Sequence, residues 1–101
     1  MITPNDLKKI KIENTDFNKI EAEIDEYIKK THGSYLWEQA IIKGEYSIEV
    51  RNIIAKKYKD NGWNFVYHRT SSEHGDKPGL TCFMFSTEKI DDKYIQLFHS
   101  I

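Results

Sequence analysis

The sequence has little of several features that would narrow its function at once. It holds one cysteine, Cys82, so no disulfide can form within the chain, and a reducing compartment is favoured. No apolar run approaches the roughly 20 residues that span a bilayer, and the first residues lack the apolar core of a signal peptide. These absences predict a cytoplasmic protein.

The chain also lacks an excess of charge of either sign. Its 15 basic and 16 acidic residues give a net charge of −1, with histidine taken as neutral. A protein that binds nucleic acid over its whole surface carries a clear positive excess, so this class is excluded. Charged residues make up 31% and hydrophobic residues 39%, which is ordinary for a soluble globular chain. The length suits a single domain over residues 1–101.

No metal or catalytic signature stands out. Zinc sites use cysteine and histidine in pairs roughly two to four residues apart, and none of the four histidines forms such a pair with another ligand. His68 and His74, with Glu73 or Asp76, are the one group that could meet across a loop to hold a metal, and the alternative is a solvated polar loop. The sequence therefore predicts no cofactor and no metal.

Apolar periodicity predicts the elements. The clearest helix begins after Ser47, which is a good N-cap, and ends at Gly62, which tolerates a left-handed cap. Aromatic residues occupy every second position on both sides of a polar loop, and this pattern predicts a β-hairpin. Phe83 and Phe85 would then lie on one face of its second strand. We expect helices over 16–32, 35–43, 48–60 and 88–98, and strands over 63–70 and 80–87. The residues expected to be mostly buried are Trp63, Phe65, Phe83, Phe85, Ile53 and Ile54.

Two segments leave alternatives open. Residues 1–14 fit either a short strand, with Ile10 and Ile12 on one side, or a flexible basic arm. The helix over 35–43 is near the lower limit of length, and the run from Ala40 to Ile42 also fits a strand.

The expected order is an α+β arrangement of three helices, a two-stranded antiparallel hairpin and a C-terminal helix. This order resembles a winged-helix domain over residues 16–87. The resemblance implies that the second and third helices form a helix-turn-helix with Gly44 in its turn and Ala40 four residues earlier. Lys43 and Glu45 depart from that motif, which has apolar residues beside the glycine. A generic α+β domain is the alternative.

A second resemblance concerns the hairpin sequence itself. The run Asn61-Gly-Trp-Asn-Phe-Val-Tyr, followed by Pro78-Gly-Leu-Thr-Cys-Phe-Met-Phe, resembles small proteins of tailed bacteriophages. The resemblance implies expression in an infected bacterium, and a regulatory or inhibitory binding role rather than a catalytic one.

Two charged surfaces are candidates for contact with a protein partner. The helix over 16–32 carries more carboxylates than lysines, and the hairpin loop carries charges of both signs. The candidate partner-binding residues are Glu21, Asp25, Glu73, His74, Asp76 and Lys77. Solvated faces that bind nothing are the alternative for both surfaces.

The winged-helix resemblance implies DNA contacts through the third helix and the wing. Arginine and asparagine can read bases, and the other basic residues would contact phosphates. The candidate DNA-binding residues are Arg51, Asn52, Lys56, Arg69 and Lys77. Residues 43–77 have an excess of only two basic residues, so we expect weak binding.

A third function rests on two copies of a His-x-Ser/Thr pattern. The patterns His32-Gly-Ser34 and His68-Arg-Thr70 resemble the active site of 2H phosphoesterases, where each histidine acts as an acid or base. We rank protein binding first, DNA binding second and phosphodiester hydrolysis third, and we expect no enzymatic activity.

Overall fold

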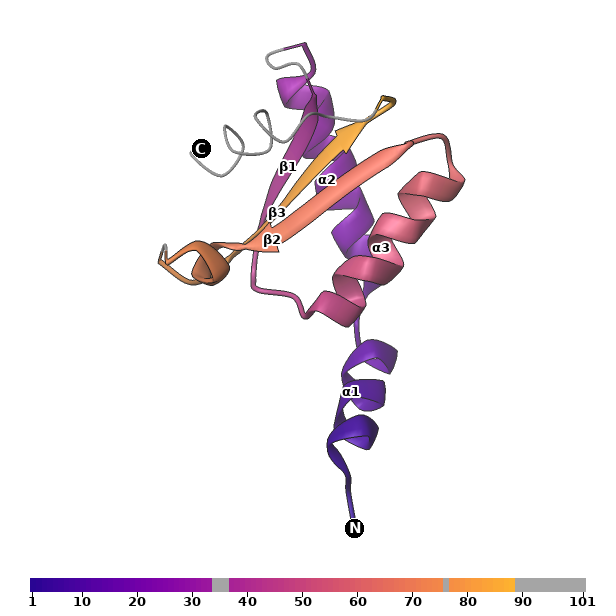
Figure 1. The fold of residues 1–101 in the computed structure, drawn as a ribbon, viewed down its shortest axis with the longest axis vertical. Helices are drawn as coiled ribbons and strands as arrows, with labels where there is room; N and C mark the ends of the chain where they lie inside the picture. The colour runs from indigo at the N-terminus through magenta and orange to yellow at the C-terminus, as the bar shows by residue number, and fades with distance from the viewer. Residues whose placement is uncertain (34–36, 76, 89–101) are drawn as a thin grey trace.

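The structure is a computed structural model that describes residues 1–33, 37–75 and 77–88. These residues form an α+β fold, as expected, with helices on one face of an antiparallel sheet (Figure 1). The elements are α1 (Pro4–Glu13), α2 (Phe17–Thr31), β1 (Glu38–Lys43), α3 (Ile48–Asp60), β2 (Phe65–Thr70), a 3-10 helix η1 (Ser71–His74) and β3 (Leu80–Ser86).

The sheet has three strands in the order β1-β3-β2, so the last strand of the chain lies at its centre. Phe83 of β3 lies opposite Ala40 of β1 and His68 of β2. The expected strands over 63–70 and 80–87 do pair, but they belong to this larger sheet and not to an isolated hairpin.

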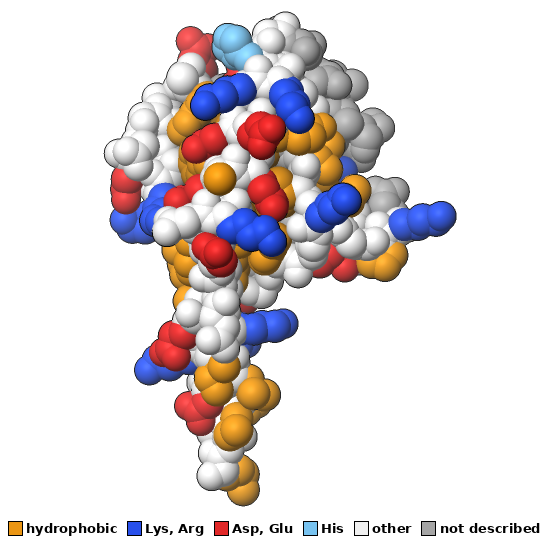
Figure 2. All heavy atoms as spheres, turned by 180° about the vertical axis from the view of Figure 1, so that it is seen from behind, with side chains coloured by type: hydrophobic (Ala, Val, Ile, Leu, Met, Phe, Trp, Pro, Cys, Tyr) orange, Lys and Arg blue, Asp and Glu red, His pale blue; other side chains and the backbone are white. Residues whose placement is uncertain are grey.

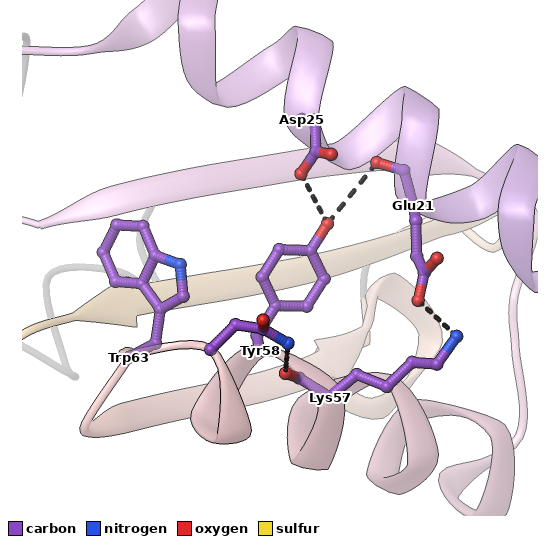
Figure 3. Close-up of a pocket in the computed structure, with 6 residues that line it drawn as sticks. Glu21, Asp25, Lys57, Tyr58 and Trp63 are labelled. Atoms are coloured by element: carbon purple, nitrogen blue, oxygen red, sulfur yellow. Dashed lines mark hydrogen bonds and ion pairs between the residues drawn. The ribbon is translucent and has the colours of Figure 1, made fainter.

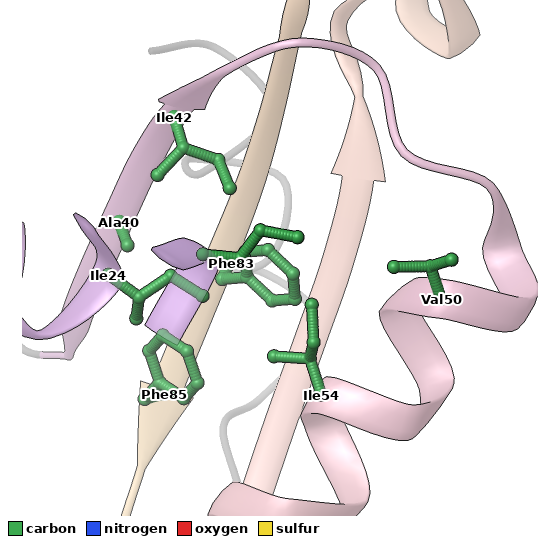
Figure 4. Packing of buried hydrophobic residues seen from close by; sticks show 8 residues of the cluster. Ile24, Ala40, Ile42, Val50, Ile54, Phe83 and Phe85 are labelled. Carbon is green, nitrogen blue, oxygen red and sulfur yellow. The ribbon is translucent and has the colours of Figure 1, made fainter. Parts of the chain in front are cut away.

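The main core lies between the sheet and the helices α2 and α3 (Figure 4). Residues of β3 alternate between the two faces, and Phe83 and Phe85 both point to the helices and are 0% exposed. Their rings stack with centroids 5.8 Å apart. The buried residues of this cluster are Ile20, Ile24, Ala40, Ile42, Val50, Ile54, Phe83 and Phe85.

The opposite face of the sheet carries a second buried cluster of Trp37, Cys82 and Met84. Phe65 belongs to this face and is only half-buried, and Trp63 is half-buried as well. Ile53 is 36% exposed. The expectation that Ile53 is mostly buried was therefore wrong, whereas the same expectation is confirmed for Phe83, Phe85 and Ile54. Trp63 and Phe65 are partly buried, and each packs against one of the two buried clusters.

The helices expected over 16–32 and 48–60 are confirmed as α2 and α3. Each begins at a side-chain cap, which satisfies a backbone donor that has no partner within the helix. Asp16 accepts a hydrogen bond from the amide of Lys19 at 3.1 Å.

The helix expected over 35–43 is wrong, because the described part of that segment is strand β1. Ala40 and Ile42 point to the core, which is the alternation of a strand. The amide of Gly44 donates to the carbonyl oxygen of Gly79 at 2.7 Å and extends the pairing to the end of the sheet. The described residues of this segment therefore do not form the helix-turn-helix implied by the winged-helix resemblance.

The short strand that residues 1–14 could have formed is wrong, because Pro4–Glu13 is helix α1. Thr3 and Asp6 form a reciprocal capping box, and proline occupies the first turn, where its missing amide costs nothing. Lys8 and Ile12 hold the helix to the body, since Lys8 pairs with Glu49 at 3.3 Å and Ile12 packs partly against the core.

The helix expected over 88–98 lies outside the described residues, apart from Glu88. Within the described part of the chain, no helix is both long enough and apolar enough to cross a membrane.

Candidate functional site

A groove of about 400 Å³ lies between the facing sides of α2 and α3 (Figure 3). Its volume is at the lower end of the range, roughly 300–1,000 Å³, in which proteins bind small ligands. Helix α2 supplies two acidic residues, α3 supplies a lysine and a tyrosine, and the turn after α3 supplies a tryptophan. The lining residues are Glu21, Asp25, Lys57, Tyr58, Asn61 and Trp63.

Tyr58 lies at the centre of this groove and connects α3 to α2. Its hydroxyl donates to Oδ1 of Asp25 at 2.7 Å and lies 3.4 Å from the carbonyl oxygen of Glu21, and its ring lies 4.8 Å from that of Phe85. Burial and the hydrogen bond to Asp25 raise the pKa of Tyr58 far above its ordinary value. Tyr58 therefore remains a neutral donor, and it orients the Asp25 carboxylate.

The two predicted acidic residues in the groove differ in their surroundings. Glu21 forms an ion pair with Lys57 at 2.8 Å, so the charges of these two residues offset each other. Asp25 is exposed and forms no ion pair with a described residue. The Asp25 carboxylate is therefore the one in the groove whose charge is not offset by a described cation, and it lies beside the ring of Trp63 (Figure 3).

The predicted loop residues do not form one surface with this groove. Glu73 lies in η1, and its carboxylate accepts from Arg51 of α3 with a shortest distance of 2.7 Å. The neighbouring Ser72 donates its amide and its hydroxyl to Glu45, and this lowers the pKa of Glu45. Lys77 is exposed, whereas Asp76 and the side chain of His74 lie outside the described residues. The described loop is thus tied to the start of α3.

The candidate DNA-binding residues are dispersed. Arg51 is only 3% exposed and its guanidinium is paired with Glu73, and Lys56 pairs with Asp60 at 2.8 Å. Arg69 is buried and lies on the sheet face opposite α3, because its neighbour His68 faces that helix. Asn52 and Lys77 are exposed. The structure therefore brings no continuous basic surface together from these residues.

The histidines of the two His-x-Ser/Thr patterns lie at opposite edges of the sheet. His32 follows α2, and its Nδ1 lies 2.5 Å from Oε1 of Glu38 in β1. His68 lies in β2, and β3 runs between these two edge strands. Two strand spacings amount to about 10 Å, so the histidines do not share one cleft. Ser34 lies outside the described residues, and those that are described contain no cluster of three metal-ligating side chains.

His68 of β2 is partly buried against the main core. Its Nε2 lies 3.1 Å from Oδ1 of Asn52, and its ring centroid lies 5.9 Å from that of Phe83. Burial lowers the pKa of His68 to about 4, and the positive charge of Arg51 adds to the effect. The ring is therefore neutral at physiological pH.

We expect this histidine to make the fold sensitive to mild acid. Because its pKa falls from 6.5 to about 4 on folding, the unfolded chain binds more protons between these two values, and stability declines as pH falls through that window. The loss attributable to His68 should be about 1–2 kcal/mol once the solvent that reaches the half-buried ring is allowed for. Urea denaturation of the wild type and of His68→Gln at pH 7 and pH 4.5 measures it. Equal pH dependence of the two proteins would contradict the assignment.

Helix α1 is a surface that the sequence did not predict. None of its residues is buried, and it projects from the body of the molecule (Figure 1). Leu7 is 56% exposed and Ile10 is 45% exposed. Among the described residues there are seven exposed large hydrophobic side chains, of which Leu7 and Ile10 lie in α1 and Met1 and Ile2 lie just before it. Figure 2 shows hydrophobic side chains gathered toward the free end of this helix. The capping box was the signal that could have identified the helix.

A scan against protein-family models and searches of curated proteins and of solved structures give no significant match to this chain.

Proposed function

We propose that this chain is a small non-catalytic binding protein that acts through protein–protein contacts, with α1 as its main docking element. The observation that carries the proposal is the apolar outer side of α1. Leu7 and Ile10 lie three residues apart and so share one side of the helix. Ile12, which faces the body, is two residues from Ile10 and thus about 200° away around the axis.

A helix of this length would gain stability from a partner. Isolated helices shorter than about 12–15 residues are marginal in water, and α1 has 10 residues, none of them buried. Its apolar side chains gain nothing while they face solvent. Docking into an apolar groove of another protein would bury them, and this is a common mode of helix recognition.

The size of α1 also indicates the form of the partner. A helix of this length is about 15 Å long and about 10 Å wide, which is small against the roughly 800 Å² that each side of a standard interface buries. A flat pairing of two α1 helices would fall short of that area. A partner that encloses α1 in a groove and also contacts the body of the domain reaches it.

The other candidate functions have less support. DNA binding through Arg51 would require the buried guanidinium to leave Glu73, and Lys56 is already paired. Phosphodiester hydrolysis would require His32 and His68 in one cleft. The origin in an infected bacterium, which the phage resemblance implies, stays a prediction.

We expect the apolar side of α1 to decide which protein is captured. Tagged wild-type protein in bacterial lysate should retain one partner at near-stoichiometric yield, and Leu7→Gln/Ile10→Gln should lose it. Glutamine is a good helix former and leaves the net charge unchanged, so the helix and the fold should persist. Leu80→Gln is the matched control, because Leu80 is 40% exposed and lies outside α1. Capture of the same proteins by the double variant would overturn the proposal.

A further inference from the structure

The groove between α2 and α3 has the chemistry of a site for a single cationic group. The rings of Trp63 and Tyr58 border it, and the Asp25 carboxylate lies beside them (Figure 3). An aromatic face attracts a cation through its quadrupole, and a carboxylate attracts it through charge. The one cation already in the groove, Lys57, is paired with Glu21 and leaves Asp25 available.

Two features hold these groups in place before any ligand arrives. Tyr58 donates to one oxygen of Asp25, which orients the carboxylate and leaves its second oxygen without a described partner. Trp63 packs against Phe85 with ring centroids 5.7 Å apart, so the indole rests on the core. A site that is ordered in advance loses less side-chain entropy on binding.

We propose that this groove receives an arginine side chain of the protein partner, with its guanidinium stacked on the Trp63 indole and paired with Asp25. Arginine fits better than lysine for two reasons. Its planar group stacks on an aromatic ring, and it can donate several hydrogen bonds in one plane. The inference deepens the proposed function, because it assigns a second point of contact on the body of the domain.

The test uses the peptide acetyl-Gly-Arg-Gly-amide and the full chain labelled with ¹⁵N. The reporter is the indole N–H signal of Trp63, and the signal of Trp37 is an internal reference because that side chain is 7% exposed. We expect the peptide to shift the Trp63 signal in a saturable way, while Trp37 stays in place. The same peptide with citrulline, which has the shape of arginine without its charge, should cause no shift.

Two variants that each remove one negative charge from α2 distinguish binding in the groove from a general electrostatic attraction to this helix. Asp25→Asn keeps the acceptor for Tyr58 and removes the negative charge, and it should weaken binding at least about fivefold. Glu23→Gln removes the same charge from the same helix but lies outside this groove, and it should change binding less than about twofold.

Three results would overturn the assignment. They are equal shifts with citrulline, equal affinity in Asp25→Asn, and a lysine peptide that binds as tightly as the arginine peptide. Because no partner protein takes part in this titration, these failures would leave the proposed role of α1 standing. Conversely, capture of the same proteins by the α1 double variant would overturn the role of α1 and would leave this site standing.

Discussion

Phe85→Ala is expected to destabilise the protein by about 3–5 kcal/mol, the usual cost of removing a buried phenylalanine side chain. Phe85 is 0% exposed and its ring contacts those of Phe83, Tyr58 and Trp63. The loss would be a large part of a total stability of roughly 5–15 kcal/mol. The midpoint of urea denaturation, at constant slope, measures it.

Phe65→Ala is the matched control for this substitution. Phe65 lies on the opposite face of the sheet and is half-buried, so less apolar surface is lost on truncation. Its cost should be clearly smaller than that of Phe85→Ala. Equal costs for the two truncations would mean that the main core does not lie between the sheet and the helices.

Glu73→Gln is expected to cost about 1–3 kcal/mol, because it leaves the Arg51 guanidinium buried without its counter-charge. Breaking a fully buried ion pair costs about 3–5 kcal/mol. The cost here is reduced because the Glu73 side chain is 48% exposed and water can reach it. Glutamine keeps the size of the side chain, so the change isolates the charge.

Asp60→Asn is the control for that substitution, since it breaks the exposed pair of Lys56 and Asp60 within α3. Such a pair contributes about 0.3–0.5 kcal/mol. Thermal unfolding of both variants compares the two costs. If Glu73→Gln were no more destabilising than Asp60→Asn, Arg51 would not depend on Glu73, and it would be freer to contact an external ligand.

Local patterns were sufficient to predict α2, α3, β2 and β3. Each combines a single clear period with a local start or stop signal, such as Ser47 before α3. The segment Ala40–Ile42 satisfies both the helical and the strand periods. Its state is decided by β3, which lies about 40 residues further along the chain and pairs with it. No local pattern contains that information.

The buried face of α3 illustrates a second limit. The sequence placed Ile53 inside, but Arg51 is buried instead and Ile53 is partly exposed. A buried arginine is stable here because Glu73, 22 positions away, accepts its hydrogen bonds. The periodicity of apolar residues cannot anticipate a partner at that separation.

The candidate site was predicted in part. Glu21 and Asp25 were identified by charge, and both line the groove between α2 and α3. Trp63 was assigned to the core because aromatic residues are usually buried, yet it is half-buried and borders the same groove. The exposed side of α1 was not predicted. Lysine and isoleucine alternate from Lys9 to Ile12 as they would in a strand, and this pattern obscured the helical spacing of Leu7 and Ile10.

The role of α1 is tested most directly by the affinity of the purified, captured partner for the wild-type protein and for its variants. Isothermal titration should give wild-type affinity for Leu80→Gln. For Leu7→Gln/Ile10→Gln it should be weaker by at least about 100-fold, because burial of each aliphatic side chain contributes about 1.5–3 kcal/mol and about 1.4 kcal/mol equals a factor of ten. Equal affinities for all three proteins would show that α1 is not the docking element and would contradict the account.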